Sequence, residues 1–263
     1  MNYETVSYEV FGPVARICHN RPEAANAENE LLLDELDQAL VRAGDDESIR
    51  VVILGGKGKH FSSGHDLRSF AKSPARSTAE GMWAQEEKYF FDYCMRIMYL
   101  PKATIAQVQG GAIAGGFMVA NMCDLIVASE DAYFSDPVLA AFGAPAVEVL
   151  IHPWVMGDRK AREFLFTGER LSARDAMAAG MVNRVVARER LEEETLALAD
   201  KIAKIPPFAM RLMKRSLNRT REFQGLRSSL SANFDTHEFS HMTTEQREYN
   251  RGSDMMDRGR KTA

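Results

Sequence analysis

A glycine-dense segment constrains this chain more than any other feature. It lies between a strand-like run and an apolar helix-like run and reads Gly110-Gly111-Ala112-Ile113-Ala114-Gly115-Gly116. Glycine adopts positive φ at low cost and lets other groups approach the backbone closely. The pattern predicts a tight strand-to-helix turn whose free amides face a ligand and hold a developing negative charge.

The spacing is close to that of a phosphate-binding P-loop but does not match it. Gly110 and Gly115 lie at the two glycine positions, whereas Gly116 and Phe117 stand where that loop needs Lys and then Ser or Thr. A nucleoside triphosphate site is therefore not expected.

A second segment of the same kind lies upstream. A buried-strand pattern at 51–56 is followed by a turn-rich stretch that contains Ser63-Gly64-His65-Asp66. Two strand-to-turn segments with exposed N–H groups are what an enzyme of carbonyl chemistry uses as an oxyanion hole. The alternative, two ordinary glycine turns in an α/β domain, stays open at this point.

Composition limits the classes of function. The chain has 263 residues, 45% of them hydrophobic and 27% charged, which is ordinary for a globular protein with a large core. The net charge of -4 does not favour binding to nucleic acid or to an anionic membrane surface. No apolar run approaches the roughly 20 residues that span a bilayer. Three widely spaced cysteines fit a reducing compartment. We expect a cytoplasmic protein without nucleic-acid or membrane partners.

Strand-like and helix-like patterns alternate through the first two thirds of the chain. Strands are predicted at 3–10, 14–19, 51–55, 104–108, 125–129, 132–135 and 181–186, and helices at 28–43, 80–98, 115–123, 158–166 and 188–204. The rest is helical in character. The prediction is an α/β core over residues 1–200 and a helical C-terminal region over 201–263, whose apolar faces suit subunit contact.

Several motifs resemble those of the crotonase superfamily, the enoyl-CoA hydratase/isomerase family. Residues 20–27, Asn-Arg-Pro-Glu-Ala-Ala-Asn-Ala, are similar to its N-R-P-x-x-x-N-A opening. Residues 61–67, Phe-Ser-Ser-Gly-His-Asp-Leu, resemble its F-(S/C)-(A/S)-G-x-D-(L/I) element. Further matches are the glycine segment up to Cys123-Asp124 and the stretch 166–182. Their order and spacing together carry the resemblance over most of the chain.

The resemblance implies an α/β fold built as a spiral of ββα turns, with a helical C-terminal trimerisation region and assembly into a homotrimer or a dimer of trimers. The substrate would be an acyl-CoA thioester, with coenzyme A as part of it and no permanently bound cofactor. The backbone N–H groups of His65 and Gly115 would bind the thioester oxygen and stabilise an enolate. Coenzyme A would lie along a set of residues comprising Ala24, Ala25, Ala27, Ser63, Asp66, Leu67 and Gly111. A contribution of Arg258, Arg260 or Lys261 to its phosphates is suggested as well.

Hydratases of this family use two glutamates as general acid and base, and the matching positions here are Met118 and Val138. Neither side chain can transfer a proton, which puts hydration in doubt. The nearest acid to Val138 is Asp136, and we weigh it as an acid or base against a turn or capping role. Glu148 is a weaker candidate for the same chemistry.

His65 offers a second kind of chemistry, because an imidazole beside an oxyanion site can hydrogen-bond a carboxylate or donate a proton near neutral pH. Family members that decarboxylate methylmalonyl-CoA have a similar Gly-His-Asp sequence. Decarboxylation and thioester cleavage tolerate the loss of both glutamates better than hydration does, and an acyl-CoA-binding trimer without turnover is a further alternative. His152 is interpreted as a packed loop residue.

The C-terminal region contains His237-Glu238-Phe239-Ser240-His241, which matches the H-E-x-x-H pattern of zinc proteases. On a helix the two imidazoles would share a face, with Glu238 as base. Downstream candidates for a third ligand are confined to Glu245, Glu248, Asp254 and Asp257. We interpret the match as a chance pattern on a subunit-packing helix and expect no bound metal.

Overall fold

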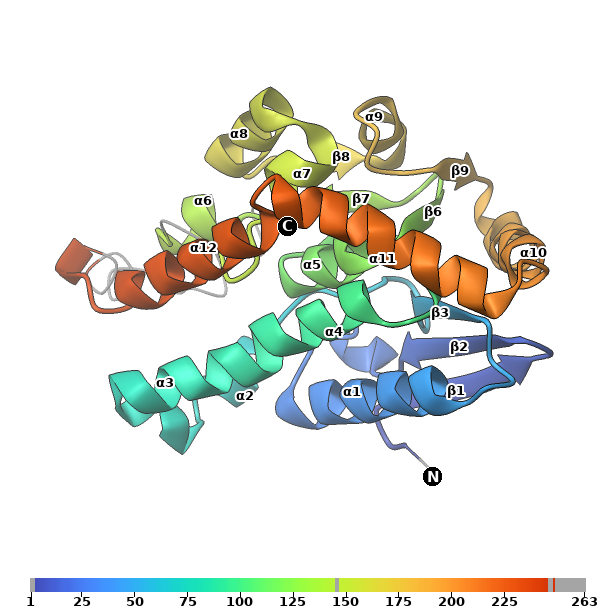
Figure 1. The fold of residues 1–263 in the computed structure, drawn as a ribbon. Coiled ribbons are helices and arrows are strands. Elements are labelled where there is room, and N and C mark those ends of the chain that lie inside the picture. Colours follow the sequence, from blue (N-terminus) through green and yellow to red (C-terminus); the bar gives the residue numbers. More distant parts are fainter. Residues whose placement is uncertain (1–2, 145–146, 246–247, 249–263) are drawn as a thin grey trace.

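The structure is a computed structural model that describes residues 3–144, 147–245 and 248 (Figure 1). A six-stranded sheet has the order β1-β2-β3-β4-β6-β9. β1 and β2 pair antiparallel and the remaining neighbours pair parallel. The strands are β1 (Val6–Phe11), β2 (Val14–His19), β3 (Val51–Gly56), β4 (Ala103–Val108), β6 (Leu125–Ser129) and β9 (Arg184–Val186).

A second, three-stranded sheet has the order β5-β7-β8, formed by β5 (Gly111–Ile113), β7 (Tyr133–Ser135) and β8 (Leu171–Ser172). β4 leads into β5 and then into helix α5 (Gly115–Met122), and β6 leads into β7 and then into helix α6 (Val138–Phe142). The segments β4-β5-α5 and β6-β7-α6 thus each contribute one strand to the large sheet, one strand to the small sheet and then a helix. These are two successive ββα turns of a spiral, as expected.

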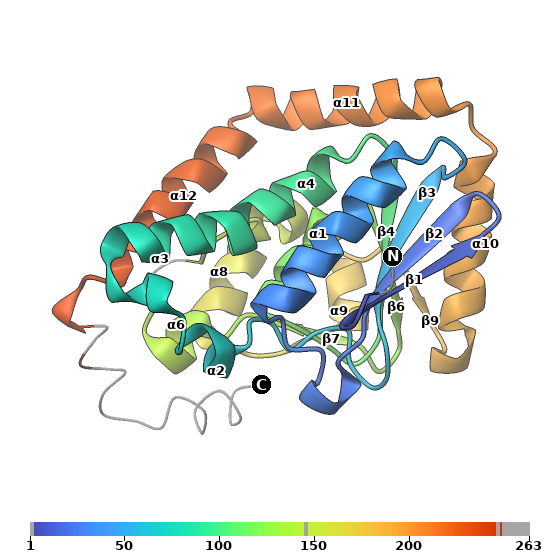
Figure 2. The ribbon, with the colours of Figure 1, turned by 90° about the horizontal axis from the view of Figure 1, so that it is seen from below.

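Alternation along the strands gives the large sheet two apolar faces. Val51 and Ile53 of β3 pack in one cluster with Leu191 of helix α10 (Leu191–Ala203), whereas Val52 and Leu54 belong to the larger core. That larger core also contains the apolar side chains of helix α1 (Glu30–Asp45) and of α5. Helices therefore cover both faces of the sheet (Figure 2).

The predicted helix at 80–98 forms with one change in its interior. It consists of α3 (Ala79–Glu86), a π-helical segment η3 (Glu87–Asp92) and α4 (Tyr93–Tyr99). π-helical turns are rare and occur often at functional sites. Glu86 directly precedes the segment, and Phe90 within it is buried in the core. Both residues enter the candidate site below.

Two long helices follow in the C-terminal region: α11 (Pro207–Phe223) crosses the front of the molecule, and α12 (Leu226–Ser240) continues from it toward α6 (Figure 1). Met210 of α11 packs against the smaller core cluster, whereas the other large apolar side chains of this helix are largely exposed: Phe208, Leu212, Met213, Leu217 and Phe223. The apolar face expected in this region is therefore present. The division at residue 200 stays a prediction, and it falls within α10.

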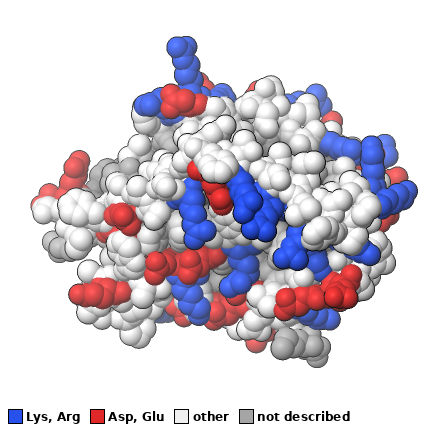
Figure 3. All heavy atoms as spheres, viewed as in Figure 1, with Lys and Arg blue, Asp and Glu red and all other residues white. Residues whose placement is uncertain are grey.

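The remaining helices are short connections around the sheets. They are η1 (Pro22–Ala24), α2 (Leu67–Phe70), η2 (Pro74–Ser77), α7 (His152–Met156), α8 (Asp158–Thr167), α9 (Ala173–Ala178) and η4 (Arg188–Arg190). Within the described ranges, no helix is long and apolar enough to cross a membrane. Acidic and basic side chains are interspersed on the face shown in Figure 3, without a broad basic field among its described residues.

Candidate active site

The two glycine-rich turns predicted from the sequence meet in the structure. Ser62 and Ala112 pair as a bridge, with Ser62 N–H donating to Gly111 O at 3.1 Å and Ile113 N–H donating to Ser62 O at 3.0 Å. Gly64 has a φ of +83°, and a Cβ there would lie 2.6 Å from Ile113 O and 3.0 Å from Gly115 N. Only glycine fits this contact without displacing the second turn.

Both turns contain backbone amides without an acceptor among the described residues. His65 N–H is one of them, and Gly115 N–H, in the first turn of α5, is another. Ala114 precedes it with φ +48° and ψ −112°, a conformation that costs an alanine about 1–3 kcal/mol. Its own N–H donates to Ser135 O at 2.9 Å and anchors the turn to β7. The backbone is thus held in a strained shape that leaves the helix N-terminus free to donate.

The His65 side chain lies between two carboxylates. Its Nδ1 is 3.5 Å from Glu28 Oε2, and its Nε2 is 3.7 Å from Glu148 Oε1. The ring stacks on Phe90 at a centroid distance of 3.6 Å. Burial lowers the pKa of His65, but the two carboxylates outweigh it and leave that pKa above its usual range. The site therefore favours an imidazolium beside the two free amides.

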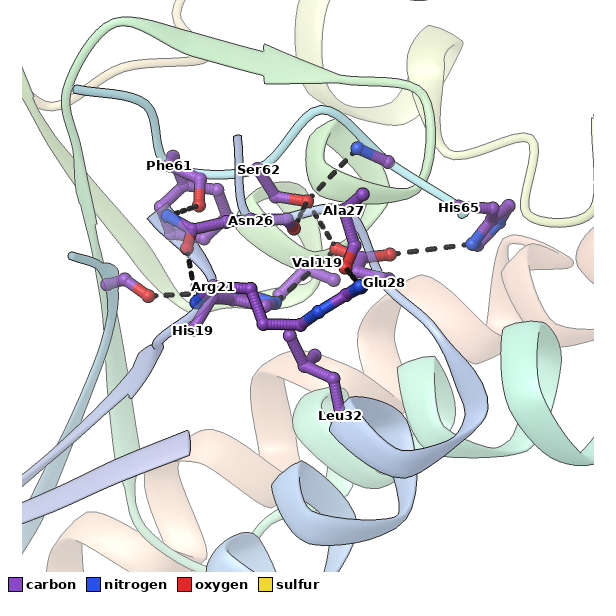
Figure 4. Close-up of polar contacts among 12 residues, drawn as sticks. His19, Arg21, Asn26, Ala27, Glu28, Leu32, Phe61, Ser62, His65 and Val119 are labelled. Carbon is purple, nitrogen blue, oxygen red and sulfur yellow. Dashed lines mark hydrogen bonds and ion pairs between the residues drawn. The ribbon is translucent and has the colours of Figure 1, made fainter. Parts of the chain in front are cut away.

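Glu28 is the fully buried centre of a polar network (Figure 4). Its Oε1 accepts a hydrogen bond from Ser62 Oγ at 2.8 Å and lies 3.4 Å from His19 Nε2. Burial raises the pKa of Glu28, yet His19 and His65 outweigh that effect and bring it to about 2. The carboxylate is ionised at neutral pH and fixes the position of both rings. Its neighbours Asn29 and Glu30 are equally polar, so no local signal marks Glu28.

The two positions matched to the hydratase glutamates are apolar and lie near the turns. Met118 is on α5 and is buried, with 1% of its surface exposed. Val138 begins α6 and lines a cavity of about 280 Å³ together with side chains of α8 and α12. Neither side chain can transfer a proton, and the match of these two positions to the hydratase glutamates stays a prediction.

Asp136 follows β7 and is buried against a histidine. Its Oδ2 lies 3.1 Å from His152 Nε2, without hydrogen-bond alignment, and both side chains have no exposed surface. The His152 ring stacks on Phe117 of α5 at 4.5 Å. His152 is therefore packed, as interpreted from the sequence, but it begins helix α7 and does not lie in a loop. Asp136 has a structural partner that the sequence did not indicate.

The residues expected along coenzyme A fall into two adjoining segments. Ser63 N–H donates to Ala25 O at 3.0 Å, which joins the segment of Ala24, Ala25 and Ala27 to the one that follows Ser63. Asp66 caps α2 and pairs with Arg21 at 3.1 Å.

Two of the remaining expected contacts differ in what they offer a ligand. Leu67 is 42% exposed, whereas Gly111 already donates its N–H to His60 Nδ1 at 2.9 Å. Gly111 can therefore contribute close approach but not a free amide. Arg258, Arg260 and Lys261 lie outside the described residues.

A second histidine cluster adjoins the first. Glu86 Oε2 accepts from His237 Nε2 at 2.9 Å and lies 3.3 Å from His241 Nε2. The cluster joins the first site through Glu148, whose Oε1 is 3.6 Å from His237 Nε2. Sequence reasoning missed Glu86, which lies 151 residues from His237.

The pKa values of the two acids in this second cluster are shifted in opposite directions. Burial raises the pKa of Glu86, but His237 and His241 outweigh it and hold that pKa well below its usual range. Burial, followed by the charge of Glu86, raises the pKa of Glu238 to about 8.

Comparison with known proteins agrees with this geometry. A sequence model described as enoyl-CoA hydratase/isomerase matches residues 10–261. A probable enoyl-CoA hydratase of Rhizobium meliloti is 35% identical over 86% of this chain and 87% of its own.

Solved structures agree as well. A probable enoyl-CoA hydratase from Mycobacterium smegmatis superposes with a TM-score of 0.85 at 47% identity, covering 92% of this chain and 95% of that one. An enoyl-CoA hydratase/isomerase from Xanthobacter autotrophicus superposes at 0.90 with 35% identity, covering 99% and 98%. The ββα spiral, the two adjoining turns and these matches together show that the chain belongs to the enoyl-CoA hydratase/isomerase family of the crotonase superfamily.

Proposed function

We propose that the protein binds an acyl-CoA thioester and stabilises its enolate through the amides of His65 and Gly115. The observation that carries the proposal is that these two amides, on turns packed against each other, have no acceptor among the described residues. Preorganised donors of this kind are typically worth about 10²–10³ in rate for each donor removed. Coenzyme A would follow the surface formed by the Ala24–Ala27 and Ser63–Leu67 segments.

The acyl group would extend toward the cavity beside Val138. This cavity of about 280 Å³ is lined mainly by apolar side chains, among them Leu139, Ala161 and Leu165. A volume of this size suits a short to medium acyl chain, because ligand pockets of a few hundred Å³ bury most of a small ligand.

Hydration is the reaction that the relatives' names suggest, but the acids it needs are replaced by Met118 and Val138. The proton-transfer groups that do lie at the site are His65 and, behind it, Glu148. We therefore infer a reaction that passes through a thioester enolate and uses His65 as a single proton donor, in place of two paired carboxylates. Decarboxylation of a malonyl-type thioester fits this requirement best, and thioester cleavage is the neighbouring alternative.

The balance of such a decarboxylation is simple. The bond between the α-carbon and the carboxylate breaks, carbon dioxide leaves, and the electron pair enters the enolate whose oxygen the two amides bind. The α-carbon then takes a proton from the His65 imidazolium, which Glu28 and Glu148 keep charged. No base is needed to remove an α-proton.

A panel of enoyl-, malonyl- and methylmalonyl-CoA thioesters, followed by mass spectrometry, tests this function. We expect loss of carbon dioxide from a malonyl-type thioester and slow or absent hydration of the enoyl-CoA. Binding of acyl-CoA with no chemical change to any member would favour the alternative of an acyl-CoA-binding protein. Absence of all binding would contradict the proposal.

Two variants separate the backbone role from the side-chain role. His65→Gln keeps the amide and removes the proton donor, so acyl-CoA binding should persist while turnover falls. At position 115 any Cβ meets Glu28 Oε2 at 2.5 Å, so Gly115→Ala is the steric control for Gly115→Pro, which also removes the N–H. The proline variant should be slower than the alanine variant, and equal rates would argue against the amide as donor.

Self-association completes the proposal. The exposed apolar side chains of α11 suit a homotrimer or a dimer of trimers, and light scattering of the purified protein measures the assembly directly.

A further inference from the structure

Three ring and carboxylate atoms outside the proposed oxyanion site converge on one point. His237 Nε2, His241 Nε2 and Glu86 Oε2 form a triangle with edges of 2.9, 3.3 and 3.1 Å, the last between the two ring nitrogens. A tetrahedral ion with bonds of about 2.0–2.1 Å separates its ligand atoms by about 3.3 Å. The triangle is thus close to one face of a tetrahedral metal site.

The elements hold these atoms in place before any ion binds. His237 and His241 are four residues apart at the C-terminal end of α12 and so share one helix face. Glu86 ends α3, and α12 packs against that helix through the edge contact of Trp83 with Phe234 at 5.2 Å. The site therefore joins two helices that are distant in the sequence.

The other oxygen of Glu86 is engaged separately. Arg76 Nη2 donates to Glu86 Oε1 at 2.7 Å, which orients the carboxylate and presents Oε2 to the two imidazoles. An outer hydrogen bond of this kind is the usual way in which proteins fix a metal-binding carboxylate.

A second observation also points to a cation. Glu238 is 4% exposed, and its Oε1 is buried without a hydrogen-bond partner among the described residues. Ligand atoms of Glu238, Glu86 and the two histidines all lie within 4.8 Å of one another. Glu86 and Glu148 both face His237, and Arg76 pairs with the outer oxygen of Glu86.

We propose that His237, His241 and Glu86 bind a divalent transition metal of the zinc class, with Glu238 beside the ion. Two imidazoles and a carboxylate at tetrahedral spacing suit Zn²⁺ better than Ca²⁺ or Mg²⁺, which prefer oxygen ligands. The H-E-x-x-H pattern thereby gains its third ligand from upstream, in place of the downstream acids considered from sequence. Through Glu148, the ion would adjoin His65 of the acyl-CoA site.

The test uses the full chain after dialysis against a chelator, with Zn²⁺ alone as the probe. We expect uptake of close to one Zn²⁺ per chain by elemental analysis and a melting temperature several degrees higher with the ion. Co²⁺ in its place should give the intense visible absorption of a tetrahedral site. Wild-type protein that takes up far less than one equivalent, or gains no stability, would overturn the proposal.

Variants locate the ion. Glu86→Gln and His241→Gln should weaken Zn²⁺ binding roughly a hundredfold, and Arg76→Gln should weaken it about tenfold. Glu163→Gln, on the exposed face of α8, is the matched control and should bind as the wild type does. If Glu86→Gln does not fold, His241→Gln at the helix end decides. Unchanged affinity in the ligand variants would place any bound zinc elsewhere and refute the site.

Discussion

Glu28 and His65 form a pair in which Oε2 of the fully buried Glu28 lies 3.5 Å from Nδ1 of the largely buried His65. The pair joins the opening segment of the chain to the turn that carries a proposed oxyanion donor. Because Glu28 has no exposed surface, its carboxylate finds its partners within the protein, namely the Ser62 hydroxyl and the facing rings of His19 and His65. The pair thus couples the charge of the site to the stability of the fold.

This pair predicts a pH dependence of the free energy of unfolding. The pKa of His65 is raised above 6.5, so its contribution is complete below about pH 6.5 and is lost as pH rises through the folded-state value. The pKa of Glu28 is lowered from 4.5 to about 2, so its contribution is present above pH 4.5 and is lost as pH falls toward 2. Both contributions are therefore complete between about pH 4.5 and 6.5.

Glu28→Gln should flatten this profile and cost about 3–5 kcal/mol, because it leaves a buried histidine pair without its carboxylate. Urea unfolding at a series of pH values measures both effects. The exposed Glu23→Gln is the control and should behave as the wild type does. A profile that Glu28→Gln leaves unchanged would show that the pair has no energetic coupling.

The two glycine positions Gly64 and Gly12 give a matched test of the turn geometry. Both have positive φ, but a Cβ at Gly64 meets Ile113 O at 2.6 Å, whereas one at Gly12 meets nothing within 4 Å. Gly12→Ala should cost only the backbone strain, about 1–2 kcal/mol. Gly64→Ala should cost more and also weaken acyl-CoA binding, measured by calorimetry. Equal effects of the two changes would contradict the close packing of the turns.

Restoring the missing acids should restore hydration. Met118→Glu combined with Val138→Glu places two carboxyl groups at the positions that the sequence resemblance matches to the family's glutamates, and such catalysis is typically worth about 10²–10⁴ in rate. Hydration of a short enoyl-CoA is the assay, with Met118→Gln combined with Val138→Gln as the uncharged control. Buried carboxyls cost stability, so the melting temperature must be measured alongside. Brisk hydration by the wild type that Asp136→Asn abolishes would show that Asp136 has taken over.

A double-mutant cycle can decide whether Asp136, which faces His152, has a structural or a catalytic role. Asp136→Leu alone should destabilise by about 3–5 kcal/mol, because it strands His152 in the core. Adding His152→Phe, which keeps a ring against Phe117, should recover most of that stability. If turnover also recovers in the double variant, Asp136 is structural. Recovered stability with lost turnover would instead make Asp136 an acid or base.

The cavity beside Val138 predicts a change in chain-length preference. Ala161→Phe fills part of a space lined by α6, α8 and α12, so acyl-CoA affinity should fall with increasing chain length and stay unchanged for acetyl-CoA. Competition binding with a series of acyl-CoA thioesters measures the trend. A uniform loss across the series would place the acyl chain outside this cavity.

Local patterns in the sequence were enough to predict most strand positions of the large sheet and the turn before α5. Periodicity located β2, β3, β4 and β6 to within a residue, because these central strands are buried and read as apolar runs. The predictions for β1 and β9 began three residues too early, since these edge strands are only partly buried. The sequence analysis did not predict the very short strands β5 and β8, because two or three residues are too few to show an alternating hydrophobic pattern. Glycine density marked the turn before α5 because positive φ and close backbone contact exclude most other residues.

The charged contacts of the site were decided by tertiary structure alone. Glu28 is indistinguishable from the polar residues around it until folding brings His65 against it, and Glu86 reads as one acid among several on an exposed helix until α12 docks. The contact of Glu28 with His65 and the contact of Glu86 with His237 each join segments that are far apart in the chain. Sequence patterns report the local backbone preference and the burial of a face, whereas the partner of a buried charge is chosen by packing between elements that no local pattern records.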